Sequence, residues 1–164
     1  METLRIATPD ELKKENKQQI ADFVAFVKDA GEASASHVDT AKCLVQLRPD
    51  KLIGTAALKT DRGYRISFFK EAGVEDLADR YPLELGYVAV DNDLRGHGLS
   101  HLVVAAALSR RENAGVCATS KLSNLAMHKV LESRGFIRVG VPWESNERGQ
   151  YLALFLSAEK RWPI

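Results

Sequence analysis

Apolar residues recur at helical spacing near the start of the chain. Thr8 has the chemistry of a helix N-cap, and Pro9 suits the first helical position. The apolar positions that follow, three or four residues apart, are Ile20, Phe23, Val24 and Val27. This pattern predicts an amphipathic first helix that runs from Pro9 up to Gly31.

Shorter alternating patterns follow this helix. Apolar residues alternate over 43–47, a Pro-Asp turn occupies 48–51, and small apolar residues fill 52–58. Because two such runs around a short turn are typical of a hairpin, we expect an antiparallel strand pair. Residues 62–69 suggest a further strand, whereas the polar, glycine-containing stretch 71–80 suggests a loop with one helical turn.

The second half of the chain alternates strands with helices. Residues 83–90, LELGYVAV, are apolar and β-branched enough for a central strand, and Asp91-Asn92-Asp93 ends it with turn chemistry. The later elements that we expect are a helix through Leu102, Val103, Ala106 and Ala107 to near Gly115, a short strand from Val116, a helix capped by Ser123 and stopped at Gly135, and final strands at 136–139 and 151–156. This order predicts a mixed α/β fold.

Length and composition favour one compact domain over residues 1–164. The chain has 164 residues and is 45% hydrophobic, which suffices for a packed core. It contains no apolar run of the roughly 18 residues that a membrane span requires, and its N-terminus lacks the apolar centre of a secretory signal. We therefore expect a cytoplasmic protein without a membrane partner.

The charges and cysteines exclude some functions. Lysine plus arginine total 23 and aspartate plus glutamate 22, so no global field favours nucleic acid or membrane. Cys43 and Cys117 lie in apolar segments without a Cys or His at metal-ligand spacing, and His37 and His101 lack such partners too. We interpret both cysteines as buried thiols and assign no metal.

The segment Arg95-Gly96-His97-Gly98 follows the central strand and precedes a helix. This order gathers backbone N–H groups and the positive end of a helix dipole around one concavity, which suits an anion. Gly96 and Gly98 let the backbone approach phosphate oxygens, and Arg95 adds a charge that can pair with phosphate. Taken alone, two glycines two residues apart also fit an ordinary turn.

The surrounding sequence adds a family resemblance. VAVDNDLRGHGLS resembles the motif of the GNAT (GCN5-related N-acetyltransferase) superfamily, an apolar strand followed by Arg/Gln-x-x-Gly-x-Gly/Ala. The spacing matches from Val90 through Arg95 to Gly98, and Ser100 stands where the family usually has Gly or Ala. The resemblance implies pyrophosphate contacts from Arg95, Gly96, the His97 backbone, Gly98, Leu99 and Ser100.

A second segment, ATSKLSNLAMHKVLESRGF, resembles the family's other signature. Asn124 stands eleven residues before Gly135, as the family pattern requires. By itself Asn124 suits a helix cap, but together the two motifs favour a contact with pantetheine. The resemblance implies a GNAT fold, a mixed central sheet with flanking helices, in which two strands splay around acetyl-CoA. The pantetheine amides would pair with the backbone of Val88, Ala89 and Val90.

The resemblance also suggests catalytic residues. Glu84 opens the cofactor strand where many GNAT enzymes carry a glutamate that acts as a base through water; the alternative is a surface carboxylate at a strand end. Leu131 stands where many members have a tyrosine that protonates the thiolate. His128 shares its helical arc with Asn124, and Tyr87 and Tyr151 are alternative acids. Backbone N–H donors on the thioester carbonyl could also suffice.

These residues lead to a ranked set of functions. The first is an acetyltransferase in which a primary amine, small molecule or protein, attacks acetyl-CoA directly in a ternary complex near the first helix and Trp143. Trp143 and Trp162 are otherwise expected to be packing anchors. The first rival is an acyl-CoA-binding regulatory protein that has lost catalysis, as Leu131 suggests.

A second rival is a toxin-like acetyltransferase that acts on aminoacyl-tRNA. Its phosphate-binding residues would be Arg110, Arg111, Lys121, Lys129, Arg134 and Arg138. The near-zero net charge disfavours this nucleic-acid partner without excluding it. The resemblance also implies a possible homodimer, formed through the last strands. The residues of this chain do not by themselves test that expectation.

Overall fold

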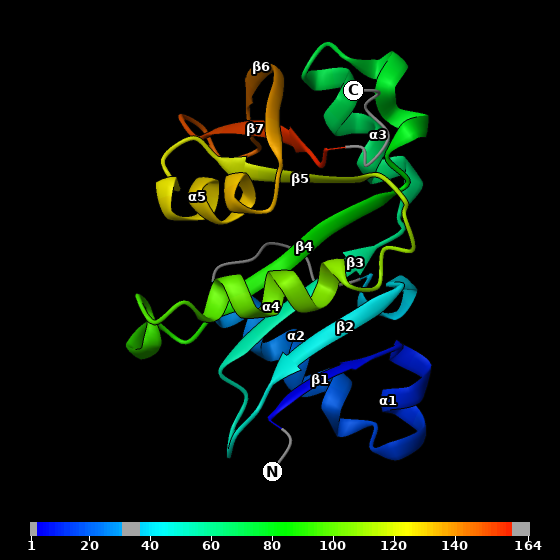
Figure 1. The fold of residues 1–164 in the computed structure, drawn as a ribbon, viewed down its shortest axis with the longest axis vertical. Helices are drawn as coiled ribbons and strands as arrows, with labels where there is room; N and C mark the ends of the chain where they lie inside the picture. Colours follow the sequence, from blue (N-terminus) through cyan, green and yellow to red (C-terminus); the bar gives the residue numbers. More distant parts are fainter. Residues whose placement is uncertain (1–2, 31–36, 159–164) are drawn as a thin grey trace. The chain divides into compact units, whose positions relative to one another are not determined.

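The computed structural model describes residues 3–30 and 37–158, which group into two compact units (Figure 1). Unit 1 comprises the described residues up to Asp61 together with Leu85–Arg110, and unit 2 comprises Arg62–Glu84 together with the described residues from Arg111 onwards. The hydrogen-bonded strands follow the order β1-β2-β3-β4-β5-β7-β6, and β4 (Leu83–Val90) contributes residues to both units. The mixed α/β fold expected from the sequence is confirmed.

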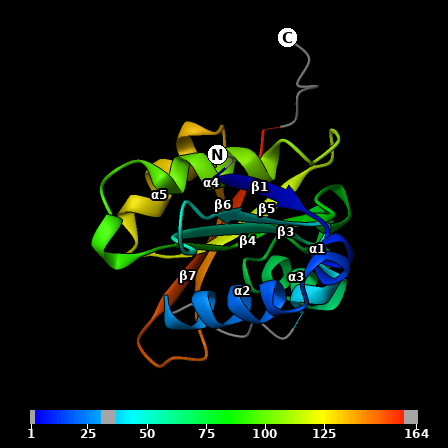
Figure 2. The same ribbon diagram turned by 90° about the horizontal axis from the view of Figure 1, so that it is seen from below.

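Unit 1 is built on an antiparallel hairpin with a helical layer on each face. β2 (Cys43–Leu47) pairs with β3 (Gly54–Lys59), with Cys43 opposite Leu58, so the predicted hairpin is confirmed. The sequence patterns did not reveal β1 (Leu4–Ala7), which pairs antiparallel with β2. Figure 2 shows α4 (Leu99–Leu108) on one face of these strands, and α1 (Pro9–Glu15) and α2 (Gln18–Asp29) on the other.

The predicted first helix is two helices, and its start is confirmed. The Thr8 Oγ1 accepts a hydrogen bond from the Glu11 N–H at 3.1 Å, and the Thr8 N–H donates to the Glu11 carboxylate, which completes a capping box. The single helix was wrong because Asn16 adopts an extended backbone and its side chain accepts from the Gln18 N–H at 2.9 Å. This local bond competes with helix continuation. Gly31, the expected end, lies outside the described residues.

Unit 2 contains a helix where the sequence suggested a strand. Residues 62–69 belong to α3 (Arg62–Glu71), and the one helical turn expected in 71–80 is the 3₁₀ helix η2 (Glu75–Arg80). The strand prediction was wrong because Phe68 and Phe69 lie on one helix face and, with Ala72 directly after the helix, pack into the unit's apolar core. A short run rich in aromatic residues fits both the two-residue repeat of a strand and the 3.6-residue repeat of a helix.

The remaining elements follow the predicted order with shifted ends. They are β5 (Val116–Lys121), α5 (Leu125–Ser133), β6 (Ile137–Glu144) and β7 (Tyr151–Leu156). α4 ends at Leu108, well before Gly115, and the helix does not resume because Glu112 and Asn113 adopt positive φ angles that a helix excludes. α5 is capped by Asn124 and not by Ser123, whereas Gly135 ends it with a φ of 83° as expected.

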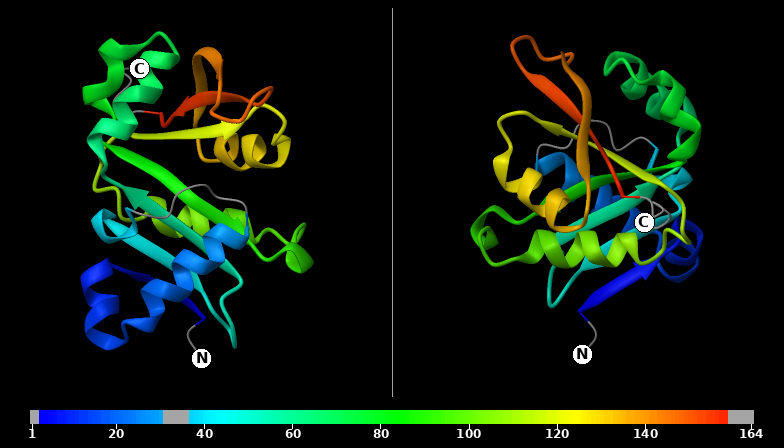
Figure 3. Two further views of the ribbon diagram at one scale, coloured as in Figure 1. Left: turned by 180° about the vertical axis from the view of Figure 1, so that it is seen from behind. Right: turned by 45° about the horizontal axis from the view of Figure 1, so that its top comes forward.

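The strand register assigns the side chains of unit 2 to two faces. Glu84 pairs with Cys117, and Cys117 with Leu156, so these three side chains project from one face of the sheet. α3 packs on that face, where Cys117, Leu154 and Leu156 join Phe68 and Phe69 in one cluster. Ala118 pairs with Phe155 on the opposite face, towards α5. Figure 3 shows α3 and α5 on different sides of β5.

Both cysteines are buried thiols, as the sequence predicted. Cys43 is 4% exposed and Cys117 is fully buried. Burial raises the pKa of the Cys43 thiol, a shift opposed by the hydrogen bond of the thiol with the Leu58 backbone and by the nearby positive charges of Arg110 and Lys42. Among the helices of the described residues, none has the length and apolarity to cross a bilayer.

Candidate active site

The loop after β4 holds two glycines in left-handed conformations. The Asp91 carboxylate accepts a hydrogen bond from the Asp93 N–H at 3.0 Å and starts the short 3₁₀ turn η3 (Asn92–Leu94). Gly96 then has a φ of 83° and Gly98 a φ of 76°. Because side chains rarely tolerate such angles, this path from β4 into α4 requires glycine at both positions.

Gly98 is the N-cap of α4, and this end of the helix is open to a ligand. The first intrahelical bond runs from the Leu102 N–H to the Gly98 carbonyl at 3.3 Å, so the N–H groups of Leu99 and Ser100 precede the helical ladder. Within residues 3–30 and 37–158, no side chain caps this end of the helix. A Cβ atom added at Gly96 or Gly98 would meet no described atom within 4 Å.

These features fit an anionic group held by backbone donors. Arg95, Gly96, His97 and Gly98 line the loop, and the helix dipole places partial positive charge at the first turn of α4. The open space beside both glycines is where phosphate oxygens could approach the backbone. The loop residues therefore suit the diphosphate of a cofactor such as coenzyme A, and the Arg95 guanidinium could pair with it.

β4 carries a local distortion at Tyr87. This residue has a φ of 50°, unusual for a side chain inside a strand, and its carbonyl accepts a hydrogen bond from the Thr55 hydroxyl at 2.8 Å. The Tyr87 ring is 2% exposed, meets Phe23 edge to face at 6.1 Å, and lies 4.5 Å from the Lys59 ammonium. The structure thus places this candidate acid in the core of unit 1.

The three residues expected to contact pantetheine follow this distortion. Ala89 and Val90 are 6% and 8% exposed, and Val88 is half-buried. Because their side chains contribute mainly to packing, a ligand contact from this segment would use the backbone. The segment ends where the Asp91 N–H donates to the Ile53 carbonyl at 2.9 Å.

Glu84 is buried, which overturns the alternative of a surface carboxylate. It is 4% exposed and pairs with Cys117 at the start of the parallel β4–β5 ladder. Since paired residues share a face, the Glu84 side chain projects to the side of the unit 2 sheet on which α3 packs. A carboxyl group held there meets little bulk water, a common setting for a general base.

The start of α5 brings Asn124 and His128 into one region. The Asn124 side chain is exposed and accepts a hydrogen bond from the Met127 N–H at 3.1 Å, so it acts as an N-cap. His128 Nε2 lies 3.0 Å from the Lys121 carbonyl oxygen, and its ring lies 5.0 Å from that of Phe155. The carbonyl contact favours a proton on Nε2. Leu131, where many family members have tyrosine, is fully buried.

Glu84 and His128 therefore face opposite sides of the unit 2 sheet. Glu84 shares the face of Cys117, whereas His128 contacts Phe155, whose partner Ala118 points the other way. The two side chains can act on one reacting group only if that group lies in the plane of the sheet. Sequence reasoning did not reveal this division, because it depends on strand register.

Trp143 is a packing residue, as the sequence favoured. Its ring stacks on Phe68 with centroids 6.2 Å apart and planes inclined by 26°, and it stays half-buried at the edge of the apolar cluster of unit 2. Trp162 lies outside the described residues. That Trp143 also lies at the edge of the acceptor site stays a prediction.

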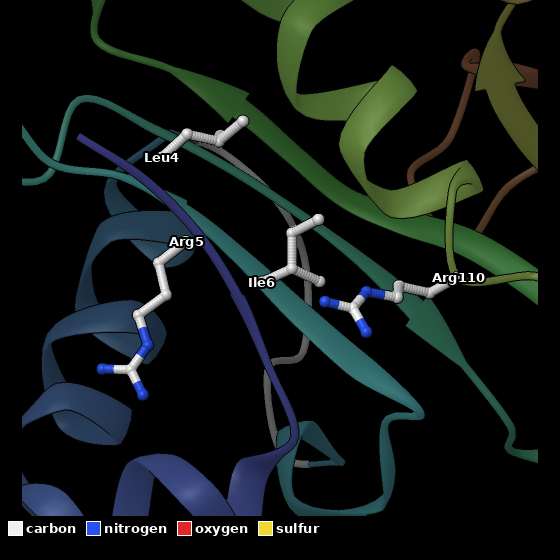
Figure 4. A pocket seen from close by; sticks show the side chains of 4 residues that line it. All are labelled: Leu4, Arg5, Ile6 and Arg110. Carbon is white, nitrogen blue, oxygen red and sulfur yellow. The ribbon is translucent and has the colours of Figure 1, made fainter. Parts of the chain in front are cut away.

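Unit 1 also has an open depression away from this loop. It measures about 580 Å³ and is lined by Leu4, Arg5, Ile6 and Arg110. Figure 4 shows Leu4, Ile6 and Arg110 projecting to one side of β1 and Arg5 to the other. In the strand order β2 and β3 separate β1 from β4, so this depression does not include the strand that leads to the glycine loop.

Comparisons with known proteins agree with this geometry. The model of the Acetyltransferase (GNAT) family matches residues 5–136. An acyl-CoA N-acyltransferase from Pseudomonas aeruginosa is similar in structure, with a TM-score of 0.68 and 14% identity over 94% of this chain and 98% of that one. Escherichia coli ElaA gives a TM-score of 0.69 and 16% identity over 96% of this chain and 100% of that one.

A third similar structure is a ribosomal-protein-alanine N-acetyltransferase from Brucella melitensis. Its TM-score is 0.60, at 18% identity over 94% of this chain and 98% of that one. At such identities these likenesses show the fold alone. A comparison with curated protein sequences gives no match. Because the family model covers most of the chain, the protein belongs to the acetyltransferase (GNAT) family.

Proposed function

We propose that this protein transfers an acetyl group from acetyl-CoA to a primary amine by direct attack in a ternary complex. The family supports acyl transfer in general. The observation that carries the proposal is the loop from Gly96 to Ser100, in which two left-handed glycines and the open end of α4 suit a diphosphate. Acetyl-CoA supplies both this diphosphate and the activated acyl group.

The cofactor would be held by several backbone contacts. Its pyrophosphate would lie against Arg95, Gly96, His97, Gly98, Leu99 and Ser100, with the Arg95 guanidinium as the charged side-chain partner. Its pantetheine amides would pair with the backbone of Val88, Ala89 and Val90, as an added strand does. We assign Asn124, which caps α5, as a further contact of the pantetheine arm. No metal takes part in this proposal.

The reaction requires a neutral amine and a departing thiol. In the step, the amine nitrogen forms a bond to the acyl carbon and the carbon–sulfur bond breaks. Glu84 would accept the amine proton through a water molecule, and its burial shields the carboxylate from bulk solvent. The thiolate would take a proton from His128 or from solvent, since a thiol with a pKa near 8.5 is a tolerable leaving group.

Three groups are candidates for protonating or stabilising the departing thiolate. His128 is half-buried in the first turns of α5 and faces the opposite side of the sheet from Glu84, so it would reach the sulfur from that side. Tyr87 is a weaker candidate because its ring is packed against Phe23. Backbone N–H donors to the thioester carbonyl are the third route.

Two alternatives keep specific support. The fully buried Leu131 cannot donate a proton, which supports an acyl-CoA-binding protein without turnover. An acetyltransferase acting on aminoacyl-tRNA would need a basic face, and Lys121, Arg134 and Arg138 are all exposed in unit 2. However, Lys121 already pairs with Glu147 at 4.0 Å, and the net charge of the whole chain is +1.

The remaining expectations also stand as proposals. We treat residues 1–164 as one functional domain, because the family model runs across residues of both units. The acceptor, small molecule or protein, is proposed to be a primary amine. A homodimer and a cytoplasmic location are proposed from the family resemblance and the sequence, and sedimentation and cell fractionation would test them.

A thiol-release assay tests the function. Purified protein is given acetyl-CoA with a panel of primary amines, and acceptor-dependent release of coenzyme A is expected. Glu84→Gln should lower this turnover by about 10²- to 10⁴-fold with little change in affinity for coenzyme A. The matched control is Glu132→Gln, an exposed carboxylate on α5. Coenzyme A binding without turnover for any amine would favour the binding protein instead.

A further inference from the structure

The Lys59 side chain crosses from β3 over the cofactor strand β4. A Cβ atom added at Gly86 would lie 2.6 Å from the Lys59 Cδ and 3.5 Å from its Nζ, so the lysine stem occupies the space that a side chain of Gly86 would fill. The Nζ lies 4.5 Å from the centroid of the Tyr87 ring. The packed stem and the ring thus hold the ammonium over Gly86 and Tyr87.

This ammonium lies on the face of the unit 1 strands that carries α2. Side chains two residues apart in a strand share a face, so Lys59 lies on the side of Ala57. Ala57 and Tyr87 pack in one apolar cluster with Phe23 of α2. The Lys59 side chain is half-buried. The amine is therefore partly shielded from bulk solvent, on the α2 side of β4.

The proposed cofactor would bring its thioester next to this amine. In coenzyme A the diphosphate, the pantetheine amides and the sulfur follow one another along a single chain. With the diphosphate at the loop 96–100 and the amides on the backbone of 88–90, the sulfur end points back along β4 towards Tyr87 and Gly86. Lys59 lies over these two residues, and all of the residues named belong to unit 1.

A lysine held above the strand approaches the acyl carbon from a productive direction. A nucleophile attacks a planar acyl carbon from above or below its plane. An arm that pairs with β4 as an added strand lies in the plane of the sheet, so an acyl group that continues the arm presents its faces to the layers above and below. The Lys59 Nζ lies in one of these layers. Holding the amine and the thioester side by side replaces a collision in solution, which raises the rate.

We propose that Lys59 is a self-acetylation site, whose Nζ takes the acetyl group from acetyl-CoA bound to the same chain when no acceptor is present. The proposal rests on the proposed function for the position of the cofactor. The neutral amine forms a bond from Nζ to the acetyl carbon, the carbon–sulfur bond breaks, and the proton lost from nitrogen passes through solvent to the departing thiolate. The products are an amide on Lys59 and coenzyme A. Acetylation removes the positive charge and with it the attraction to the Tyr87 ring.

Peptide mass spectrometry after incubation with acetyl-CoA alone tests this site. Lys28, on α2, is exposed and serves as the internal control, whereas Lys59 is half-buried. Undirected acetylation by free acetyl-CoA should modify the exposed lysine faster. We expect the opposite order, with Lys59 acetylated about tenfold faster than Lys28 or more, at a rate that saturates with acetyl-CoA. Lys59→Arg keeps a cation over Tyr87, and the intact protein should then lose the fast gain of one acetyl group.

Three glycine variants connect the modification to the geometry. Gly86→Ala places a methyl group against the Lys59 stem, which must move aside, and should slow the acetylation of Lys59 at saturating acetyl-CoA. The matched control Gly54→Ala adds a methyl group to β3 at 3.4 Å from the nearest atom, the Val103 Cγ1, and should keep the native rate. Gly98→Asp, which is expected not to bind the cofactor, should lose the fast reaction. Fast acetylation of Lys59 that persists in Gly98→Asp would come from free acetyl-CoA and would contradict the proposal.

The outcomes separate this proposal from the proposed function. If the protein binds coenzyme A and acetylates added amines, but modifies Lys59 no faster than Lys28, self-acetylation is overturned and the proposed function stands. Fast, saturable acetylation of Lys59 without turnover of any added amine supports the site and contradicts the proposed acceptor. If calorimetry shows no coenzyme A binding, the proposed function fails, and acetylation of Lys59 no faster than that of Lys28 then overturns the self-acetylation site as well.

Discussion

Two glycines of unit 2 share a left-handed backbone but have different surroundings. Gly140 has a φ of 66°, and a Cβ atom there would lie 2.3 Å from the Ala72 carbonyl oxygen. Gly149 has a φ of 82°, and a Cβ atom there would meet no described atom within 4 Å. The contact at Gly140 occurs where α3 docks on β6, at a register shift between Val139 and Trp143.

This difference gives a stability prediction. Gly149→Ala should lower the free energy of unfolding by about 1 kcal/mol, the conformational cost of a side chain at that angle. Gly140→Ala should cost about 3 kcal/mol, because the backbone of Ala72 must also move. Urea denaturation measures both variants. Equal losses in the two variants would show that the close approach of Ala72 and Gly140 is absent.

Cys43 predicts a pH dependence of stability. Burial raises the pKa of its thiol in the folded protein above the unfolded value. Its contribution to stability is therefore fully present below the unfolded pKa and is lost as the pH rises through the folded pKa. Urea unfolding at pH values from neutral to well above the ordinary thiol pKa of about 8.5 should show a smaller decline for Cys43→Ala than for the native protein. Identical declines would mean that the thiol titrates alike in both states.

At the scale of elements, the sequence predicted best where the signal was local. The Thr8 cap, the hairpin around 48–51 and the strand 83–90 each depend on residues close in the chain, and each is confirmed. The strand expected at 62–69 failed because its aromatic residues pack as a helix on distant strands. No local pattern contains that contact.

Asn124 has two proposed roles, as the N-cap of α5 and as a contact of the cofactor. Its side chain caps α5, and we propose that it also contacts pantetheine. Asn124→Ala should lower the free energy of unfolding by about 1 kcal/mol, whereas Asn124→Ser, also a good cap, should restore it. We expect the affinity for coenzyme A to stay weakened in Asn124→Ser. Full recovery of affinity, measured by calorimetry, would leave capping as the only role of Asn124.

At the scale of the whole molecule, the motifs predicted the family and the fold. They did not predict that the candidate catalytic residues lie on opposite faces of the sheet. The spacing of Arg95, Gly98 and Asn124 sufficed for the family, which the match over residues 5–136 confirms. The left-handed Tyr87, the opposite faces of Glu84 and His128, and the packing of α3 on the face of Glu84 depend on register and packing. A glycine beside Tyr87 was the one local sign of the distortion in β4.

The central claim is that the loop from Gly96 to Ser100 holds the diphosphate of coenzyme A, and a calorimetric titration of coenzyme A tests it most directly. The native protein should bind coenzyme A. Gly98→Asp should abolish binding, because it places a side chain at a φ of 76° and a negative charge next to the phosphates. Gly149→Asp, with a comparable φ in a different loop, should bind normally. Native protein without affinity, or Gly98→Asp with unaltered affinity, would contradict the account.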